Sequence, residues 1–244
     1  MSVNNMPAYT ISNENQRWAT TVIPDVKKVL TVAGSGDQAL FYKLAGAKIV
    51  DTFDITCNAR VVQDMKFVAI KNMNPVEYKE LLIKTHRSDG AALEFFLCDM
   101  WNLLPDETQK IIQNGKFDMI FGCGLDASFY PENIPTPKEF EKLRKVLNKP
   151  FGFIWSDLES LSIKLTKKYD VINLSNIFDY CPDAKMQVKI LDELSAHLTK
   201  NGRIVYLPQK QKFDYKALVL PMLAYEKTVV YDNQNKMIIF QRTR

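Results

Sequence analysis

The sequence predicts a single α/β domain whose sheet is mostly parallel, with an antiparallel hairpin at its C-terminal edge. Short apolar, β-branched runs alternate with helical patterns in residues 29–55 and again after residue 150, an order typical of parallel sheets. The last two runs, Lys227–Tyr231 and Lys236–Arg242, are separated by the turn residues Asp-Asn-Gln-Asn and predict the hairpin. The mostly helical stretch of about 58–150 predicts an insertion within one domain of residues 1–244.

The first 55 residues predict a βαβ unit. Val29–Ala33 is a short β-branched run of the kind found in a strand buried on both faces. It leads directly into Gly34-Ser35-Gly36, and Gln38–Ala45 then has the pattern of a helix that Gly46 would end. Lys48–Ile55 follows as a second strand. Parallel strands joined in this way need a crossover, which is right-handed in nearly all sheets.

Helices dominate the predicted insertion. From residue 57 onward, apolar side chains recur every three or four positions until Asn74-Pro75, which should end the helix. Three prolines within Tyr130–Pro137 predict a loop, while Phe117–Phe121 fits a strand or a helix. The further predicted helices are 76–83, 91–104, 106–113 and 137–147.

The alternating pattern resumes after the insertion. The spacing of apolar residues predicts a helix over about 183–198, with Gly202 in the turn that ends it. Residues 214–224 predict one more helix before the hairpin, despite Pro221. Three short apolar runs predict the remaining strands, at Phe151–Trp155, Val171–Leu174 and Arg203–Leu207.

Composition narrows the function classes. The chain has 46% hydrophobic and 25% charged residues, as globular proteins do, and its net charge of +4 is too small to indicate nucleic acid, so no nucleic-acid partner is predicted. It holds two histidines and four cysteines without a Cys-x-x-Cys pair, so no metal site is predicted. The absence of a signal-peptide pattern and of an apolar run of about 18 residues predicts a cytoplasmic protein without a transmembrane segment. Peripheral contact with a membrane stays open.

The residues that follow the predicted strands indicate a nucleoside site. In an open α/β sheet, ligands bind at the carboxyl ends of the strands, where glycines let the backbone approach closely. The first strand ends in Gly34-Ser35-Gly36, and Asp54 follows about 20 residues later, a spacing suited to ribose hydroxyls, although Gly-x-Gly alone also fits a structural turn. Ala39 replaces the third glycine of dinucleotide sites. Asp37 would repel a pyrophosphate but suit an ammonium group, which favours a nucleoside without phosphates over NAD.

Two motifs resemble those of the class I S-adenosylmethionine-dependent methyltransferases: Val-Leu-Thr-Val-Ala-Gly-Ser-Gly-Asp at 29–37 and Val-Asp-Thr-Phe-Asp-Ile at 50–55. More narrowly, the Gly-Ser-Gly-Asp-Gln-Ala loop, the long helical insertion and Leu-Ser-Asn-Ile-Phe-Asp-Tyr at 174–180 resemble the family that includes the betaine-lipid synthase, a diacylglycerol aminocarboxypropyltransferase. The resemblance extends from about Tyr9 to the C-terminus. It implies a Rossmann-like class I methyltransferase sheet with S-adenosyl-L-methionine as cofactor. The resemblance does not imply the substrate, and we expect transfer of a methyl or aminocarboxypropyl group to a small-molecule or lipid acceptor.

The resemblance implies roles for single residues around the cofactor. The glycine loop would lie against its amino-acid part and ribose, Asp54 would bind the ribose hydroxyls, and Ile55 would pack on the adenine. Asp157 and Leu158 would meet the adenine amino group and ring, although Asp157 also fits a loop carboxylate. Ser175 would help to form the floor beneath the reacting sulfonium. The implied cofactor-binding residues are Gly34, Ser35, Gly36, Asp37, Asp54, Ile55, Asp157, Leu158, Ser175 and Asn176.

Asp179 and Tyr180 are the implied catalytic pair on the acceptor side. Asp179 is a candidate general base, and Tyr180 is a candidate for a hydrogen-bonding role. Asp179 also fits a cap for the helix after Pro182. The segment Ile11–Arg17 is expected to close over the cofactor.

Two other function classes stay open from the sequence. One is an NAD-dependent oxidoreductase built on the same βαβ unit, and the other is a non-catalytic S-adenosylmethionine-binding protein. Transfer from a sulfonium mainly needs an aligned acceptor and exclusion of water, which fits a chain with two histidines. Neither the acceptor, the transferred group nor the oligomeric state follows from the sequence.

Overall fold

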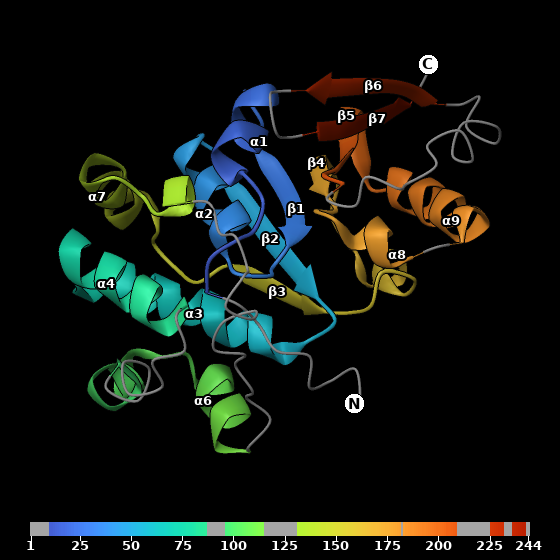
Figure 1. Cartoon of the computed structure of the whole chain (residues 1–244). Helices are drawn as coiled ribbons and strands as arrows, with labels where there is room; N and C mark the ends of the chain where they lie inside the picture. Colours follow the sequence, from blue (N-terminus) through green and yellow to red (C-terminus); the bar gives the residue numbers. More distant parts are fainter. Residues whose placement is uncertain are drawn as a thin grey trace.

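The computed structural model describes residues 10–86, 96–114, 131–181, 183–208, 225–231 and 236–242. Within these ranges the strands form a single seven-stranded sheet at the centre of the molecule (Figure 1). The strands are β1 (Lys28–Val32), β2 (Ile49–Asp54), β3 (Gly152–Trp155), β4 (Tyr169–Asn173), β5 (Leu198–Tyr206), β6 (Tyr225–Tyr231) and β7 (Lys236–Arg242).

The strand order is β3-β2-β1-β4-β5-β7-β6. β1 to β5 pair in parallel, whereas β7 runs antiparallel to both β5 and β6. The predicted α/β fold, mostly parallel with a C-terminal antiparallel hairpin, is therefore confirmed. The chain moves outward from β1 to β2 and β3, then returns to place β4 on the other side of β1.

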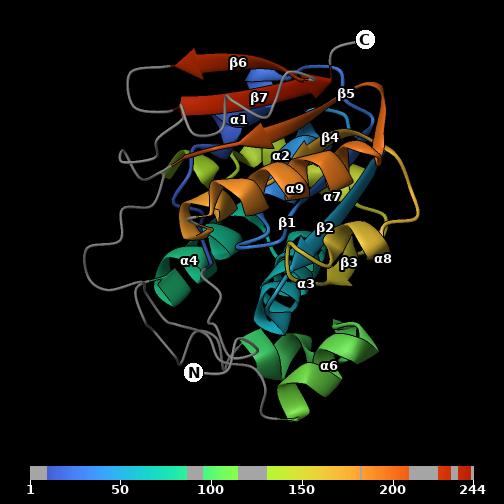
Figure 2. The ribbon, with the colours of Figure 1, turned by 90° about the vertical axis from the view of Figure 1, so that its right-hand side faces the viewer.

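Helices cover both faces of the sheet (Figures 1 and 2). One face and its outer layer carry the helices that precede β3 in the chain: α1 (Gln16–Val22), α2 (Asp37–Leu44), α3 (Cys57–Asn72), α4 (Pro75–His86), α6 (Asp106–Gln113) and α7 (Pro137–Val146). The opposite face has α8 (Leu161–Lys164) and α9 (Ala184–Ser195), and the short 3₁₀ turns are η2 (Trp101–Leu103), η3 (Pro131–Asn133) and η4 (Ile177–Tyr180). On the first face α6 packs on α3, and on the other face α9 contacts β5.

Two hydrophobic clusters lie on the two faces of the sheet. Val29 of β1 belongs to the cluster that packs under α2 and α3, while its neighbour Leu30 belongs to the cluster under α9. Both side chains are fully buried because successive strand residues point to opposite faces. This double burial explains why the strand sequence is continuously apolar instead of alternating.

Helix boundaries follow local sequence signals. α3 begins after Thr56, whose hydroxyl accepts the Asn58 N–H at 3.2 Å, and it ends just before Asn74-Pro75 as predicted. α7 begins at Pro137, and Thr136 forms a capping box with Glu139. The predicted segments 117–121 and 214–224 lie outside the described residues. Among the described helices, none combines the length and the apolar character needed to cross a membrane.

The predicted turn at Gly202 is wrong, because this residue lies inside β5. α9 ends at Ser195 and β5 already begins at Leu198. The β4–β5 register jumps from Tyr169↔Leu198 to Val171↔Arg203, so β5 carries an irregularity that holds the extra residues. A Cβ on Gly202 would lie 2.8 Å from both Leu198 Cβ and the Tyr169 carbonyl oxygen, so glycine is needed here for close packing.

Candidate functional site

The candidate site lies at the carboxyl ends of β1, β2, β3 and β4, on one edge of the sheet (Figure 1). After β1 the chain enters α2 on one face, whereas after β4 it enters α9 on the other face. The order therefore reverses between β1 and β4, and such a switch point opens a crevice where α/β sheets bind ligands. The predicted loop residues from all four strands come to this edge.

The glycine loop after β1 needs its glycines for conformation. Gly34 and Gly36 have φ of 46° and 82°, in the left-handed region that favours glycine. A Cβ on Gly36 would lie 3.4 Å from Gln63 Cα on α3. The buried Gln63 amide has no hydrogen-bond partner among the described residues, so it is a polar group available beside the loop.

Asp54 joins the loop after β1 to the loop after β2. Its Oδ2 accepts the Gly34 N–H at 3.0 Å, and its Oδ1 accepts the Thr56 N–H at 3.1 Å. Burial raises the pKa of the Asp54 carboxyl, although the backbone N–H groups of Gly34 and Thr56 act in the opposite direction. The carboxylate thereby sets the separation of the two loops and keeps further lone pairs for hydroxyl donors.

Asp37 is part of a buried ion pair. Its Oδ1 contacts Lys66 Nζ of α3, and the two side chains are 1% and 3% exposed. Its Oδ2 accepts the Ser12 N–H at 2.7 Å and the Ser35 hydroxyl at 2.9 Å. Burial lowers the pKa of Lys66, while the carboxylate of Asp37 counteracts this. The charge that the sequence suggested for a cationic ligand is thus already paired with a lysine.

Glu14 belongs to the segment Ile11–Arg17 but has no predicted role of its own, and it connects the side chains that follow β1 and β4. Its Oε1 accepts the Ser175 hydroxyl at 2.6 Å, at the end of β4. Its Oε2 accepts the side-chain amides of Gln16 at 2.8 Å and Gln38 at 2.9 Å. Burial raises the pKa of Glu14 to about 7, and these hydrogen bonds offset only part of that effect. A single carboxylate therefore connects the segment before α1 with both strands of the switch point.

The segment before α1 is fastened by the residues that precede and begin α7. Asn133 Nδ2 donates to the carbonyl oxygens of Ser12 at 3.1 Å and Glu14 at 2.7 Å, and its Oδ1 accepts the Gln16 N–H at 3.1 Å. Arg17 pairs with Glu139 of α7, and this pairing lowers the pKa of Glu139 to about 2. The expected closure of Ile11–Arg17 over a cofactor is a proposal that this packing supports.

Ser175 has an unusual backbone at the end of β4. Its φ is 52°, a left-handed value that is uncommon for a residue other than glycine. Its N–H donates to Asn173 Oδ1 at 2.9 Å and its carbonyl oxygen accepts the Leu207 N–H at 2.8 Å. These bonds hold the loop in a conformation that turns the Ser175 hydroxyl toward Glu14, with half-buried Asn176 following. Such local strain is typical of functional loops.

The loops after β2 and β3 supply the remaining predicted cofactor residues. Asp157 is exposed, and its Oδ1 accepts the Ser160 N–H at 2.7 Å, which lowers its pKa. Leu158 is half-buried against the cluster under α9. The carbonyl oxygen of half-exposed Ile55 accepts Trp155 Nε1 at 2.9 Å. Asp157 therefore has the loop-stabilising contact that the sequence left as an alternative.

The two predicted catalytic residues lie on η4, directly after Asn176. Asp179 Oδ1 accepts a hydrogen bond from the Tyr206 hydroxyl of β5, whereas the Tyr180 side chain is 69% exposed. The alternative that Asp179 caps the next helix is wrong, because Asp183 caps α9 by accepting the Lys185 N–H at 2.9 Å. Asp179 thus lies at the same edge as the loops after β1 and β4, bonded to Tyr206.

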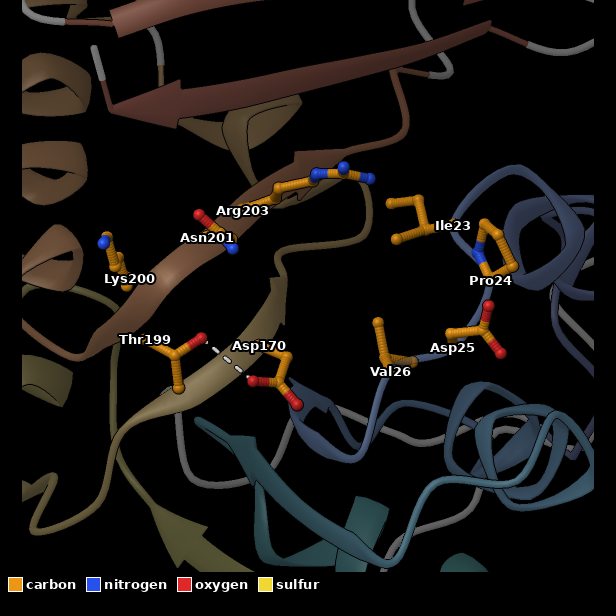
Figure 3. A pocket seen from close by; sticks show the side chains of 9 residues that line it. All are labelled: Ile23, Pro24, Asp25, Val26, Asp170, Thr199, Lys200, Asn201 and Arg203. Atoms are coloured by element: carbon orange, nitrogen blue, oxygen red, sulfur yellow. Dashed lines mark hydrogen bonds between the residues drawn. The ribbon is translucent and has the colours of Figure 1, made fainter. Parts of the chain in front are cut away.

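A separate cavity of about 330 Å³ opens at the opposite edge of the sheet (Figure 3). Asp25 and Val26 line it from the chain before β1, and Asp170 and Thr199 line it from β4 and β5. Asp170 accepts the Thr199 hydroxyl at 2.9 Å and the N–H groups of Lys27 and Lys28, so it stabilises the amino ends of strands. This cavity does not belong to the candidate site.

Comparison with known proteins identifies the fold. The sequence matches no family model and no curated protein. The rRNA methyltransferase AviRa from Streptomyces viridochromogenes superposes with a TM-score of 0.52 at 12% identity, over 99% of this chain and 90% of that chain. A ribosomal protein L11 methylase from Lactobacillus delbrueckii subsp. bulgaricus superposes with a lower TM-score of 0.43 at 12% identity, over 94% of this chain and 75% of that chain. The N-methyltransferase NodS from Bradyrhizobium japonicum WM9, in complex with S-adenosyl-L-homocysteine, also has a TM-score of 0.43, at 8% identity over 90% of this chain and 79% of that chain. The predicted class I methyltransferase sheet is confirmed at the level of the fold.

The prediction that nucleic acid is not a partner is contradicted. AviRa has the same fold over almost the whole chain and is an rRNA methyltransferase. The prediction rested on a net charge of +4, which averages over the entire surface. Binding to phosphates depends on where basic side chains cluster locally, so a small net charge excludes nothing.

Proposed function

We propose that this protein, which has the sheet of the class I methyltransferases, binds S-adenosyl-L-methionine and transfers its methyl group to an acceptor. The observation that carries the proposal is the bond of 3.0 Å between the Gly34 N–H and Asp54 Oδ2. It holds a glycine loop and a carboxylate at the carboxyl ends of neighbouring parallel strands, the arrangement that suits an amino-acid group beside a ribose.

The residues at the switch point fit this ligand. Asp54 has free lone pairs for the ribose hydroxyls, and Ile55 offers apolar surface for the adenine. On the side of β3, Asp157 and Leu158 are proposed to meet the adenine amino group and ring. Gln63, buried and unpartnered among the described residues, supports the presence of a polar ligand next to Gly36. The proposed cofactor residues are those predicted: Gly34, Ser35, Gly36, Asp37, Asp54, Ile55, Asp157, Leu158, Ser175 and Asn176.

For this transfer the protein mainly has to align the acceptor with the methyl group of the cofactor. When bound, the cofactor supplies an electrophilic methyl group on a sulfonium. Ser175 and Asn176 are proposed to form the floor of that position, and Asp179, oriented by the Tyr206 hydroxyl, faces the acceptor and can take its proton. Exposed Tyr180 is proposed to contact the acceptor itself.

The acceptor is proposed to be a small molecule or a lipid, although the resemblance at residues 174–180 does not itself imply the substrate. AviRa acts on rRNA, so RNA belongs among the acceptors to test. None of the similar structures described above is named as an aminocarboxypropyltransferase, which favours methyl transfer over transfer of the larger group.

The products distinguish these reactions. Purified protein is incubated with S-adenosylmethionine and either a small-molecule and lipid extract or total RNA. Methyl transfer releases S-adenosylhomocysteine, whereas aminocarboxypropyl transfer releases methylthioadenosine. We expect S-adenosylhomocysteine in one of the two incubations. Binding of the cofactor without either product would point to a non-catalytic binding protein instead.

Binding is tested separately by calorimetry with Asp54→Ala. Losing the loop-setting carboxylate and its ribose contacts is expected to lower S-adenosylmethionine affinity about 100-fold, since hydrogen bonds to charged groups contribute about 1.5–3 kcal/mol each. Asp170→Ala is the matched control, because Asp170 also accepts two backbone N–H groups but at the opposite edge. Equal affinities of both variants, or tight binding of NAD with none of S-adenosylmethionine, would overturn the proposal.

A further inference from the structure

Glu14 is a buried carboxylate without a cation. It is 2% exposed, and its two oxygens accept hydrogen bonds from Gln38, which follows β1, and from Ser175, which follows β4. Its hydrogen-bond donors are a serine hydroxyl and two side-chain amides, all of them neutral. No lysine, arginine or histidine of the described ranges forms an ion pair with it.

The ionisable groups around Glu14 make its charge less favourable. Burial is the main cause of the raised pKa of Glu14, and Asp179 on η4 adds to it as a like charge. The Asp37–Lys66 pair, from α2 and α3, is bonded internally, so Lys66 is committed to another carboxylate. A buried carboxylate in such surroundings is costly unless a positive group arrives.

The same group of side chains contains a hydrogen-bond acceptor that receives no hydrogen bond from the described residues. Gln16 uses its amide nitrogen to bond both Glu14 and the Ser12 hydroxyl. The oxygen of that amide is buried and has no hydrogen-bond partner among the described residues. The crevice therefore combines an unpaired negative charge with an unused acceptor, a pair that suits a positively charged group carrying several N–H donors.

We infer that Glu14 is the counter-ion for the α-ammonium group of the bound S-adenosyl ligand. The inference rests on the proposed function. An ammonium group offers three N–H donors, whereas the sulfonium offers none and could not satisfy Gln16. Asp37 keeps its predicted place in the glycine loop, where its contacts to Ser12, Ser35 and Lys66 hold the loop in shape.

This assignment makes the segment before α1 part of the binding site. Glu14 is carried by a stretch that Asn133 bonds at two carbonyl oxygens, and it reaches Gln38 after β1 and Ser175 after β4. A ligand cation between these elements would balance the negative charge of Glu14. The segment recognises the amino-acid end of the ligand, while Asp54 serves its ribose end.

The affinities of three related nucleosides, measured by calorimetry, distinguish a contact of Glu14 with the ammonium group from a contact with the sulfonium and from a structural role. S-adenosylmethionine has an ammonium and a sulfonium, S-adenosylhomocysteine has the ammonium alone, and methylthioadenosine has neither. We expect Glu14→Gln to weaken the first two about 10- to 100-fold each and to leave methylthioadenosine within about twofold, as suits one charge-assisted contact. Glu132→Gln is the control, since it removes the same charge from an exposed position next to Asn133.

The other outcomes are equally informative. A loss confined to S-adenosylmethionine would place Glu14 at the sulfonium and overturn the inference. Equal losses for all three ligands would indicate a structural role and overturn it too. If the wild-type protein binds none of the three, the proposed function itself fails, whereas a wild type that binds them while Glu14→Gln changes nothing refutes only the inference.

Proton release by the wild-type protein tests the inference without a variant, so the test does not depend on Glu14→Gln folding correctly. Because the ammonium stabilises the charged carboxylate, binding at pH 6.5 should expel the proton that Glu14 holds in the free protein. With its pKa about 7, S-adenosylhomocysteine should release about three quarters of a proton, measured by calorimetry in buffers of different ionisation enthalpy. Methylthioadenosine should release none. Equal proton release with both ligands would overturn the assignment.

Discussion

Replacing Lys66 by methionine tests whether the buried pair with Asp37 holds the glycine loop in place. The two side chains are 3% and 1% exposed, so Lys66→Met leaves a carboxylate in the interior without its cation. Breaking a buried pair in this way costs about 3–5 kcal/mol. We therefore expect the free energy of unfolding to fall by about 3–5 kcal/mol.

Urea unfolding of four proteins measures this loss: the wild type, Lys66→Met, Asp37→Asn and the double variant. The double variant should recover much of the stability that Lys66→Met loses, since no unpaired charge remains. Lys84→Met is the control, because its Glu80 partner is 3.7 Å away and both side chains are more than half exposed, so a change below about 0.5 kcal/mol is expected. A loss below 1 kcal/mol in Lys66→Met, or no recovery in the double variant, would refute the reasoning.

Two further predictions concern the same crevice. Gly36→Ala should lower stability by about 1–2 kcal/mol in thermal unfolding, because it places a Cβ at φ 82° and 3.4 Å from Gln63 Cα; an unchanged melting temperature would contradict this. Since the pKa of Glu14 is raised from 4.5 to about 7 in the folded state, its contribution to stability is fully present below about pH 4.5 and is lost as the pH rises through 7. The free energy of unfolding should therefore be about 2.5 kcal/mol larger near pH 5 than near pH 8 from this group alone, and Glu14→Gln should flatten the profile measured by urea unfolding; parallel profiles would contradict the prediction.

Much of the fold was predictable because the strands carry local signals. The run Val29–Ala33 is apolar on both faces, since β1 lies between β2 and β4 with a hydrophobic cluster on either side. The hairpin was predictable because turn residues separate two runs rich in strand-forming residues. The error at Gly202 has a physical cause as well. Glycine meets two needs, a helix end and a close approach to Leu198 and the Tyr169 carbonyl, and only the three-dimensional structure distinguishes them.

The charges of the candidate site were less predictable. The acid in the loop after β1 was recognised, but its partner Lys66 lies on α3, where the sequence alone indicates an exposed lysine on a helix. Glu14 contacts Ser175, which is 161 residues further along the chain. No periodicity or spacing connects residues so far apart. One signal was present: the segment Ser-Asn-Glu-Asn-Gln is wholly polar yet begins a helix, so its acid was a candidate for more than solvation.

Asp37 and Glu14, the two buried acids beside the glycine loop, differ in whether a basic side chain of the described residues pairs with them. Asp37 is neutralised by Lys66, a permanent part of the protein, so the loop keeps its shape whether or not a ligand is bound. Glu14 has no such partner among the described residues, and its burial opposes the packing of the segment before α1. That segment must therefore be held by other contacts in the free protein, which the bonds of Asn133 and the Arg17–Glu139 pair provide. A ligand cation would turn the opposing contribution of Glu14 into a favourable one, so binding and closure of the segment are coupled through a single carboxylate.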